Sequence, residues 1–270
     1  MHYKKSIKLN PNTAITYTNY ANLLKTIGKV DEAIDNYKKS LEINPNNYKT
    51  LNNIAITLEE KGNFHEAREL LEKAIKIDSK NYLAHYSMGN VYKALGLNSA
   101  AIKCYELAKE ANDEDSGIKN NLGLILSEEG RYEEAIENYK SILKTNPESV
   151  RSLLNIASVY RQVGQLKKAM EFNNKAMEFN KDKEIEQFIY SNQATMELDA
   201  GDFKNSIKNN KKALALNPNL FLAYDNACLT SQMIGEYESL TSSYKQLLSQ
   251  LKPSKEITSK NDILNKKIEK

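Results

Sequence analysis

A glycine recurs along this chain at an almost constant interval, and that interval limits the fold more than any other feature. Successive glycines stand 34 residues apart five times and 37 residues apart once: Gly28, Gly62, Gly96, Gly130, Gly164, Gly201 and Gly235. Periods of 20–50 residues are typical of repeat arrays, in which each unit buries its apolar face against the next. The sequence therefore predicts a solenoid rather than a domain around one central core.

Two further positions in each unit carry small residues. We number a 34-residue unit so that its glycine is column 15, which makes the units begin at Ala14, Tyr48, Tyr82, Ser116, Val150, Gln187 and Phe221. Column 8 is small in all seven units, and column 20 in six of them. Facing small residues let two antiparallel helices approach closely. The glycine can close the first helix, and Pro45, Pro147 and Pro218 can end the second. No segment alternates like a strand, so we expect an all-α chain.

These columns resemble the tetratricopeptide repeat over about Ala14 to Ser254. In that family, small residues fill columns 8 and 20, a large residue fills column 24, and proline often fills column 32. The family's frequent Trp in column 4 is absent. The resemblance implies a right-handed superhelical solenoid of antiparallel helix pairs, with the first helix of each pair on the concave face.

The ends of the chain depart from the repeat. The segment YKKSIKLNPN at residues 3–12 matches YKKSLEINPN at residues 37–46, so residues 1–13 are expected to be the second helix of a preceding unit. The chain would then be a fragment, which we favour, or its uncapped end would contact another chain. Residues 14–254 make seven units, and residues 255–270 are expected to be a capping helix with a Lys-rich end. The 37-residue step places three extra residues near Lys183 to Glu186, which are interpreted as a longer surface loop rather than a functional hinge.

Composition excludes some functions. Net charge is +3, and the excess lies in residues 252–270, which leaves equal numbers of basic and acidic residues elsewhere. A neutral body argues against a nucleic-acid partner. No apolar run is long enough for a membrane helix, and the first residues lack a secretory signal, so no membrane partner is expected. Cys104 and Cys228 are too far apart in a solenoid to pair, which is consistent with a reducing, cytoplasmic location.

Column 6 of the first helix holds asparagine in six of seven units: Asn19, Asn53, Ser87, Asn121, Asn155, Asn192 and Asn226. An Asn amide is both a donor and an acceptor, so it can bind a peptide backbone without contacting side chains. Asparagine is unfavourable inside a helix, so its recurrence in column 6 argues for a functional role. Against this, the chain is rich in asparagine, and duplication of repeats would copy the residue from one repeat to the next. Four neighbours could widen the polar strip: Asn22, Asn52, Asn90 and Asn120.

This asparagine ladder resembles the tetratricopeptide domain of O-GlcNAc transferases, in which column-6 asparagines hold substrate peptides. No glycosyltransferase domain follows in this sequence. A carboxylate clamp for chaperone C-termini needs Lys in column 5, and no unit has one. Binding of chaperone C-termini is therefore not expected.

Signals of catalysis are absent from the sequence. The three histidines lack metal-ligand spacing, and there is no phosphate loop, nucleophile elbow or paired catalytic carboxylate. We therefore expect no enzyme activity, catalytic residue, metal or cofactor. The predicted function is a scaffold that binds an extended peptide or protein segment in its concave groove. The alternatives are a substrate-recruiting arm of a larger enzyme, such as a protein glycosyltransferase, and a structural subunit of a multiprotein assembly.

Overall fold

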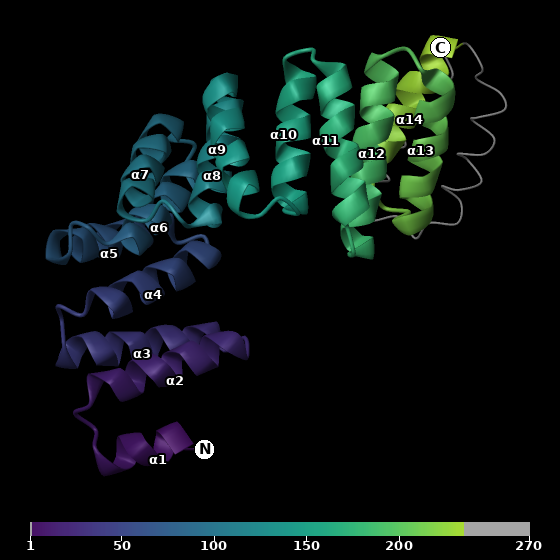
Figure 1. The fold of residues 1–270 in the computed structure, drawn as a ribbon. Coiled ribbons are helices and arrows are strands. Elements are labelled where there is room, and N and C mark those ends of the chain that lie inside the picture. The colour runs from purple at the N-terminus through teal and green to yellow at the C-terminus, as the bar shows by residue number, and fades with distance from the viewer. Residues whose placement is uncertain (1, 235–270) are drawn as a thin grey trace. The chain divides into compact units, whose positions relative to one another are not determined.

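The computed structural model describes residues 2–234, and this part of the chain is helical with no strand (Figure 1). The helices are α1 (His2–Leu9), α2 (Ala14–Thr26), α3 (Val30–Ile43), α4 (Tyr48–Glu60), α5 (Phe64–Ile77), α6 (Tyr82–Ala94), α7 (Asn98–Ala111), α8 (Ser116–Glu128), α9 (Tyr132–Thr145), α10 (Val150–Gln162), α11 (Leu166–Phe179), α12 (Lys183–Asp199), α13 (Phe203–Leu216) and α14 (Phe221–Ile234). The all-α prediction is confirmed. Within residues 2–234, no helix is both long and apolar enough to span a membrane.

The predicted unit starts coincide with helix starts, with one exception. The first helices α2, α4, α6, α8, α10 and α14 begin at the first residue of their predicted units. Helix α12 instead begins at Lys183, before Gln187, and has 17 residues where α10 has 13. The expected surface loop is therefore wrong, because the three extra residues lengthen this helix. Asp182 caps the new start by accepting a bond of 2.8 Å from the Glu184 amide.

The recurrent glycine closes each first helix as predicted. All six glycines of column 15 that the structure describes have φ between +73° and +80°. This left-handed conformation strains residues with a Cβ, but glycine adopts it readily. After Gly28, the Lys29 amide donates back to the Leu24 carbonyl at 2.9 Å, which satisfies one of the carbonyls left at the helix end. The 34-residue period is thus the spacing between the C-terminal ends of successive first helices.

The chain divides into two compact units, and the boundary between them lies between Asn138 and Tyr139, within α9. In the first unit, α2 packs on α3, α4 on α5 and α6 on α7, while α2 contacts α4 and α4 contacts α6. In the second unit, α10 packs on α11 and α12 on α13, while α12 contacts both α10 and α14. In each unit, the first helices thus form a continuous surface, which we call the first-helix face.

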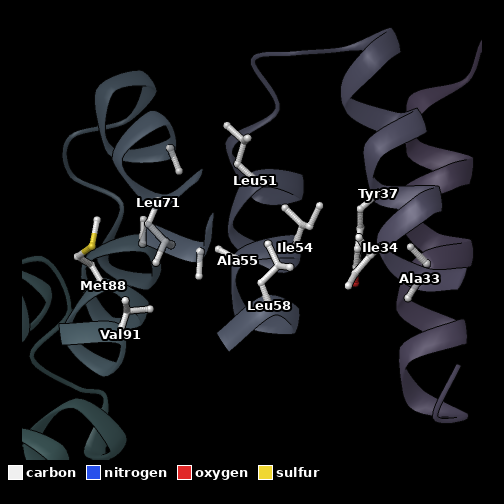
Figure 2. Close-up of a cluster of buried hydrophobic side chains, with 14 of the residues drawn as sticks. Ala33, Ile34, Tyr37, Leu51, Ile54, Ala55, Leu58, Leu71, Met88 and Val91 are labelled. Atoms are coloured by element: carbon white, nitrogen blue, oxygen red, sulfur yellow. The ribbon is translucent and has the colours of Figure 1, made fainter. Parts of the chain in front are cut away.

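The core lies between successive pairs rather than at one centre. Figure 2 shows Tyr37 of α3 directed toward Ile54 and Leu58 of α4, and Ala55 on the opposite side of α4 facing the next pair. All four side chains are at most 2% exposed. Each pair therefore buries apolar surface against its neighbours, as a repeat array requires.

The small residue of column 8 allows close packing of the two helices in a pair. A Cβ added to Gly89 of α6 would lie 2.5 Å from Cε1 of Tyr105, on the partner helix α7. The Tyr105 ring is fully buried and cannot move into solvent. This contact gives the predicted preference for small residues a direct steric cause.

We expect Gly89→Ala to lower the free energy of unfolding by about 1 kcal/mol. Overpacking of a core costs about 1–3 kcal/mol, and the higher helix propensity of alanine offsets up to about 1 kcal/mol of that cost. Urea unfolding followed by circular dichroism measures the change. A variant as stable as the parent would contradict the close contact with Tyr105.

The structure describes the N-terminal end of the chain from residue 2, but not the residues after 234. Residues 2–9 form α1, which packs on α2, with the Tyr3 and Tyr20 ring centroids 6.0 Å apart. Leu9 is 79% exposed, whereas Ile43, its counterpart one unit later, is 38% exposed. The assignment of residues 1–13 to a preceding unit stays a prediction. The expected capping helix at residues 255–270 lies outside the described residues, as does the end of the seventh unit.

Candidate peptide-binding face

The residues of the predicted ladder lie midway along the first helices, but their exposure differs. Asn19 is exposed, and Asn53, Asn121, Asn155 and Asn192 are half-buried. Ser87 and Asn226 are only 2% and 3% exposed. A bound peptide could reach the first five residues, whereas Ser87 and Asn226 are too deeply buried for such contact.

In the first compact unit, the ladder residue Asn53 is hydrogen-bonded to an asparagine of the preceding helix pair. Nδ2 of Asn53 on α4 donates to Oδ1 of Asn22 on α2 at 3.2 Å. The Tyr37 hydroxyl on α3 donates to the same oxygen at 2.5 Å. An amide oxygen has two lone pairs, so these two bonds saturate it. Asn22 is left with its NH2 group, and Asn53 is left with its Oδ1.

The same arrangement occurs two repeats later. Nδ2 of Asn121 on α8 donates to Oδ1 of Asn90 on α6 at 3.2 Å, and the Tyr105 hydroxyl donates to that oxygen at 2.8 Å. Asn121 also donates to the Tyr86 hydroxyl at 2.9 Å, which leaves Asn121 with a free Oδ1 and Asn90 with a free NH2. Two asparagine pairs, Asn22–Asn53 and Asn90–Asn121, thus carry a donor beside an acceptor.

Burial keeps both tyrosines in the donating form. It raises the pKa of Tyr37 and the pKa of Tyr105 above the ordinary phenol value, because the charged phenolate would lose its hydration. A protonated phenol can donate to the Asn oxygen, so the amide keeps its NH2 group pointing away from the tyrosine. The tyrosines therefore fix which end of each amide stays available.

Only some of the predicted polar strip is supported by the structure. Asn22 and Asn90 belong to the asparagine pairs and are accessible. Asn52 and Asn120 in column 5 are 5% and 8% exposed, so the expectation that they widen the strip is wrong. Asn120 instead donates to the Ser116 carbonyl of its own helix at 2.9 Å.

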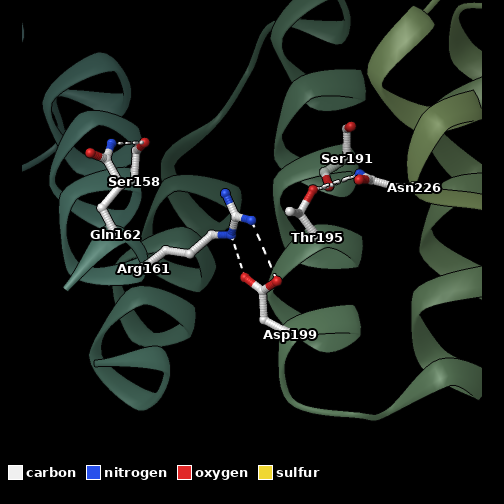
Figure 3. Close-up of polar contacts among 7 residues, drawn as sticks. All are labelled: Ser158, Arg161, Gln162, Ser191, Thr195, Asp199 and Asn226. Carbon is white, nitrogen blue, oxygen red and sulfur yellow. Dashed lines mark hydrogen bonds and ion pairs between the residues drawn. The ribbon is translucent and has the colours of Figure 1, made fainter. Parts of the chain in front are cut away.

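The ladder is also less uniform than its sequence suggests. In the second unit, the Asn226 amide is held inside the structure by the Thr195 hydroxyl at 2.6 Å and the Ser191 carbonyl at 3.5 Å (Figure 3). Asn53, Asn121 and Asn226 thus all use their NH2 group to join successive helix pairs. The role of column 6 is therefore partly structural, and in Asn53 and Asn121 only the remaining side-chain oxygen can bind a ligand.

Sequence reasoning missed Tyr37 and Tyr105 as parts of this face. Both occupy column 24, where a large residue was expected to fill space only. A signal was present, because tyrosine in column 24 coincides with asparagine in column 9 of the first and third repeats. The bond between them joins residues 15 positions apart on two helices, and it becomes visible only once the pair is folded.

Cys104 shows no sign of a reactive site. It is a free, half-buried cysteine, and burial raises the pKa of its thiol to about 11. The thiol is therefore neutral near pH 7 and a weak nucleophile. Among the described residues, no three His, Cys, Asp or Glu side chains gather in a way that could hold a metal ion.

Comparisons with known proteins agree with the fold. Sequence models described as tetratricopeptide or TPR repeats match residues 14–47, 36–69, 59–96, 82–115 and 114–182. A search of curated proteins gives no match. Among solved structures, the chain is similar to YrrB, described as a TPR protein with an unusual peptide-binding site, at 26% identity and a TM-score of 0.56, over 67% of this chain and 94% of that chain.

Two further solved structures are similar over most of their lengths. A crystal structure of MamA is 28% identical with a TM-score of 0.56, over 63% of this chain and 92% of that one. PilF of Pseudomonas aeruginosa is 16% identical with a TM-score of 0.67, over 78% of this chain and 95% of that one, and supports the fold alone. The matching repeats run without interruption from residue 14 to residue 182. The chain therefore belongs to the tetratricopeptide-repeat family.

Proposed function

We propose that this chain is a non-enzymatic binding module that holds an extended segment of another protein on its first-helix face. The observation that carries the proposal is the fixed orientation of the pairs Asn22–Asn53 and Asn90–Asn121, set by two buried tyrosines. Each pair offers an NH2 donor next to a carbonyl acceptor. A peptide group presents the complementary C=O and N–H, whatever its side chains are.

Preorientation matters because each bond to the peptide is weak. A single hydrogen bond contributes about 0.5–1.5 kcal/mol net, and ordering one flexible side chain at an interface costs about as much. The tyrosines and the Asn–Asn bonds meet that ordering cost during folding. Four bonds from the two pairs then supply about 4 kcal/mol, and the loss of translational and rotational freedom on association, about 4 kcal/mol or more, offsets that gain. Tighter binding requires apolar contacts as well.

The family supports this reading. Tetratricopeptide repeats generally bind proteins or peptides, and YrrB, a similar structure, is described as having a peptide-binding site. Apart from residues 252–270, the sequence of this chain carries equal numbers of basic and acidic residues. The absence of a net charge in this part of the chain is consistent with recognition of peptide backbone rather than of a highly charged segment.

The test starts from peptides selected for binding to the full chain out of a random display library. We expect Asn53→Ala combined with Asn121→Ala to weaken binding of the best peptide at least tenfold, because both backbone acceptors are removed. Isothermal titration calorimetry measures the affinity, and circular dichroism checks that the helices persist.

The matched control removes two asparagines that belong to neither pair. Asn46 and Asn146 lie exposed in turns, so replacing both with alanine should leave the affinity unchanged. Equal affinities for the parent and the Asn53/Asn121 variant would contradict the proposed backbone contacts.

A further inference from the structure

The second compact unit lacks, in column 9, the asparagine that holds a ladder asparagine in the first compact unit. Column 9 is Asn22 or Asn90 in the two asparagine pairs, but on α10 it is Ser158, which is exposed. The ladder residue one repeat later is Asn192 on α12. No described residue bonds to its side-chain amide, in contrast to Asn53. The shorter serine therefore leaves this amide without a partner.

A pocket opens beside Ser158 and Asn192. A cavity of about 180 Å³ opens on the first-helix face of the second unit between α10, α12 and α14. Its lining residues are Ala157, Ser158, Arg161, Asn192, Thr195, Met196 and Leu222. Ala157 and Met196 are each 1% exposed and give it an apolar floor, and Leu222, 44% exposed, gives it an apolar rim.

The size of the pocket restricts what it can bind. Sites for drug-sized molecules and cofactors have volumes of about 300–1,000 Å³, so this pocket is too small for such a ligand. An apolar cavity of about 150 Å³ holds a benzene ring. The pocket therefore fits one aromatic or branched aliphatic side chain.

The polar rim of the pocket suits the backbone on either side of such a residue. Arg161 donates through Nε to Asp199 at 2.5 Å and through Nη2 to its other oxygen at 3.4 Å (Figure 3). This pair neutralises both charges and holds the guanidinium in place. Nη1 has no partner among the described residues, so it can donate to a peptide carbonyl, while the Asn192 amide can bond to a neighbouring peptide group.

We propose that this pocket binds a single apolar side chain of an extended peptide, with Asn192 and Arg161 holding the peptide backbone beside it. The inference rests on the proposed function and assigns side-chain preference to the second unit, whereas the asparagine pairs of the first unit recognise backbone. Leucine, isoleucine, methionine and phenylalanine fit the floor, and an acidic or basic side chain would lose its hydration there. The apolar contact supplies affinity that hydrogen bonds alone do not.

The test uses methyl NMR of the full chain with 13C-methyl methionine. Met196→Leu, which conserves volume, identifies the Met196 signal. The probes are capped Gly-Ser peptides of eleven residues whose central residue is leucine, alanine or aspartate. We expect the leucine peptide to shift the Met196 signal in a saturable way, with at least fivefold weaker binding for alanine and no response to aspartate.

The decisive variant is Ser158→Asn, which restores the residue that the first and third repeats carry in column 9. It should narrow the pocket, bond to the Asn192 amide and weaken the leucine-dependent shift, while the melting temperature stays within a few degrees. Ser99→Asn, at an exposed site on α7, is the control and should leave the shift intact.

Three outcomes would overturn the inference. The first is a Met196 signal that does not change when the leucine peptide is added. The second is an affinity for the leucine peptide that is the same in Ser158→Asn as in the parent. The third is a Met196 shift that depends on protein concentration without peptide, which would place a second copy in the pocket. The side-chain amide signals of Asn53 and Asn121 are recorded in the same titration. If they respond while Met196 does not, backbone binding stands and this pocket is not its side-chain site.

Discussion

Ala135→Asp is expected to unfold the fourth repeat, lowering the free energy of unfolding by about 3–5 kcal/mol. Ala135 occupies column 20 on α9 and is fully buried. A carboxylate placed at that site would lose its hydration without a charged partner, and an uncompensated buried charge costs several kcal/mol. In a repeat array, damage to one repeat also weakens its packing against the repeat before it.

The loss of stability in Ala135→Asp should increase as the pH rises. Burial would raise the pKa of the introduced carboxyl above its unfolded value, so the neutral form persists in the folded state to higher pH. The variant should therefore be closest to the parent below about pH 4 and should lose stability as the pH rises toward 7. Thermal melts at several pH values measure this trend.

A control substitution on the surface of the same helix shows whether the loss of stability comes from burying the carboxylate or from the charge alone. Lys140 is exposed on α9, so Lys140→Asp should change the melting temperature only slightly. If Ala135→Asp melts like the parent at pH 7, column 20 does not lie at a close helix crossing.

Asn210→Leu, in contrast to Ala135→Asp, is expected to stabilise the protein and to raise the free energy of unfolding by about 2 kcal/mol. Asn210 on α13 is fully buried, and neither Nδ2 nor Oδ1 of its side chain has a hydrogen-bond partner among the described residues. Leaving a buried polar group unpaired costs about 1–3 kcal/mol. Column 24 holds leucine at Leu71, which is also fully buried, so the repeat accepts this side chain.

The neighbouring asparagine provides the matched contrast. Asn209 donates to both carboxylate oxygens of Glu197, at 3.0 and 2.8 Å, and Glu197 is only 8% exposed. Asn209→Leu removes that partner and should destabilise the protein by about 1–3 kcal/mol. Urea unfolding of both variants decides the matter: if the two shift stability in the same direction, the unpaired Asn210 amide is not what weakens this repeat.

The fold could be predicted closely because its determinants are local. A glycine with positive φ ends a helix through its own backbone, and small residues in columns 8 and 20 mark where helices cross. The lengthened α12 could not be predicted from spacing alone. A three-residue insertion fits a loop as well as an extra helical turn, and the outcome depends on the cap that Asp182 provides.

The candidate site was predicted only in outline. Column 6 does lie on the first helices, but the sequence does not say which amide atoms are already used within the protein. That depends on bonds between residues far apart in the chain, such as the one between Asn53 and Asn22, 31 positions apart. The pocket near Asn192 is lined by residues of three helices, and the sequence pattern does not show that space remains between them.

Backbone recognition on the first-helix face is tested most directly by an ester scan of the selected peptide. Each peptide N–H in turn is replaced by an ester oxygen, which deletes one donor and keeps the side chains. We expect one or two positions to lose about five- to tenfold in affinity, or about 1 kcal/mol, and these losses to vanish when Asn53 and Asn121 are alanine. Ester peptides that all bind the parent protein as tightly as the amide would contradict backbone recognition.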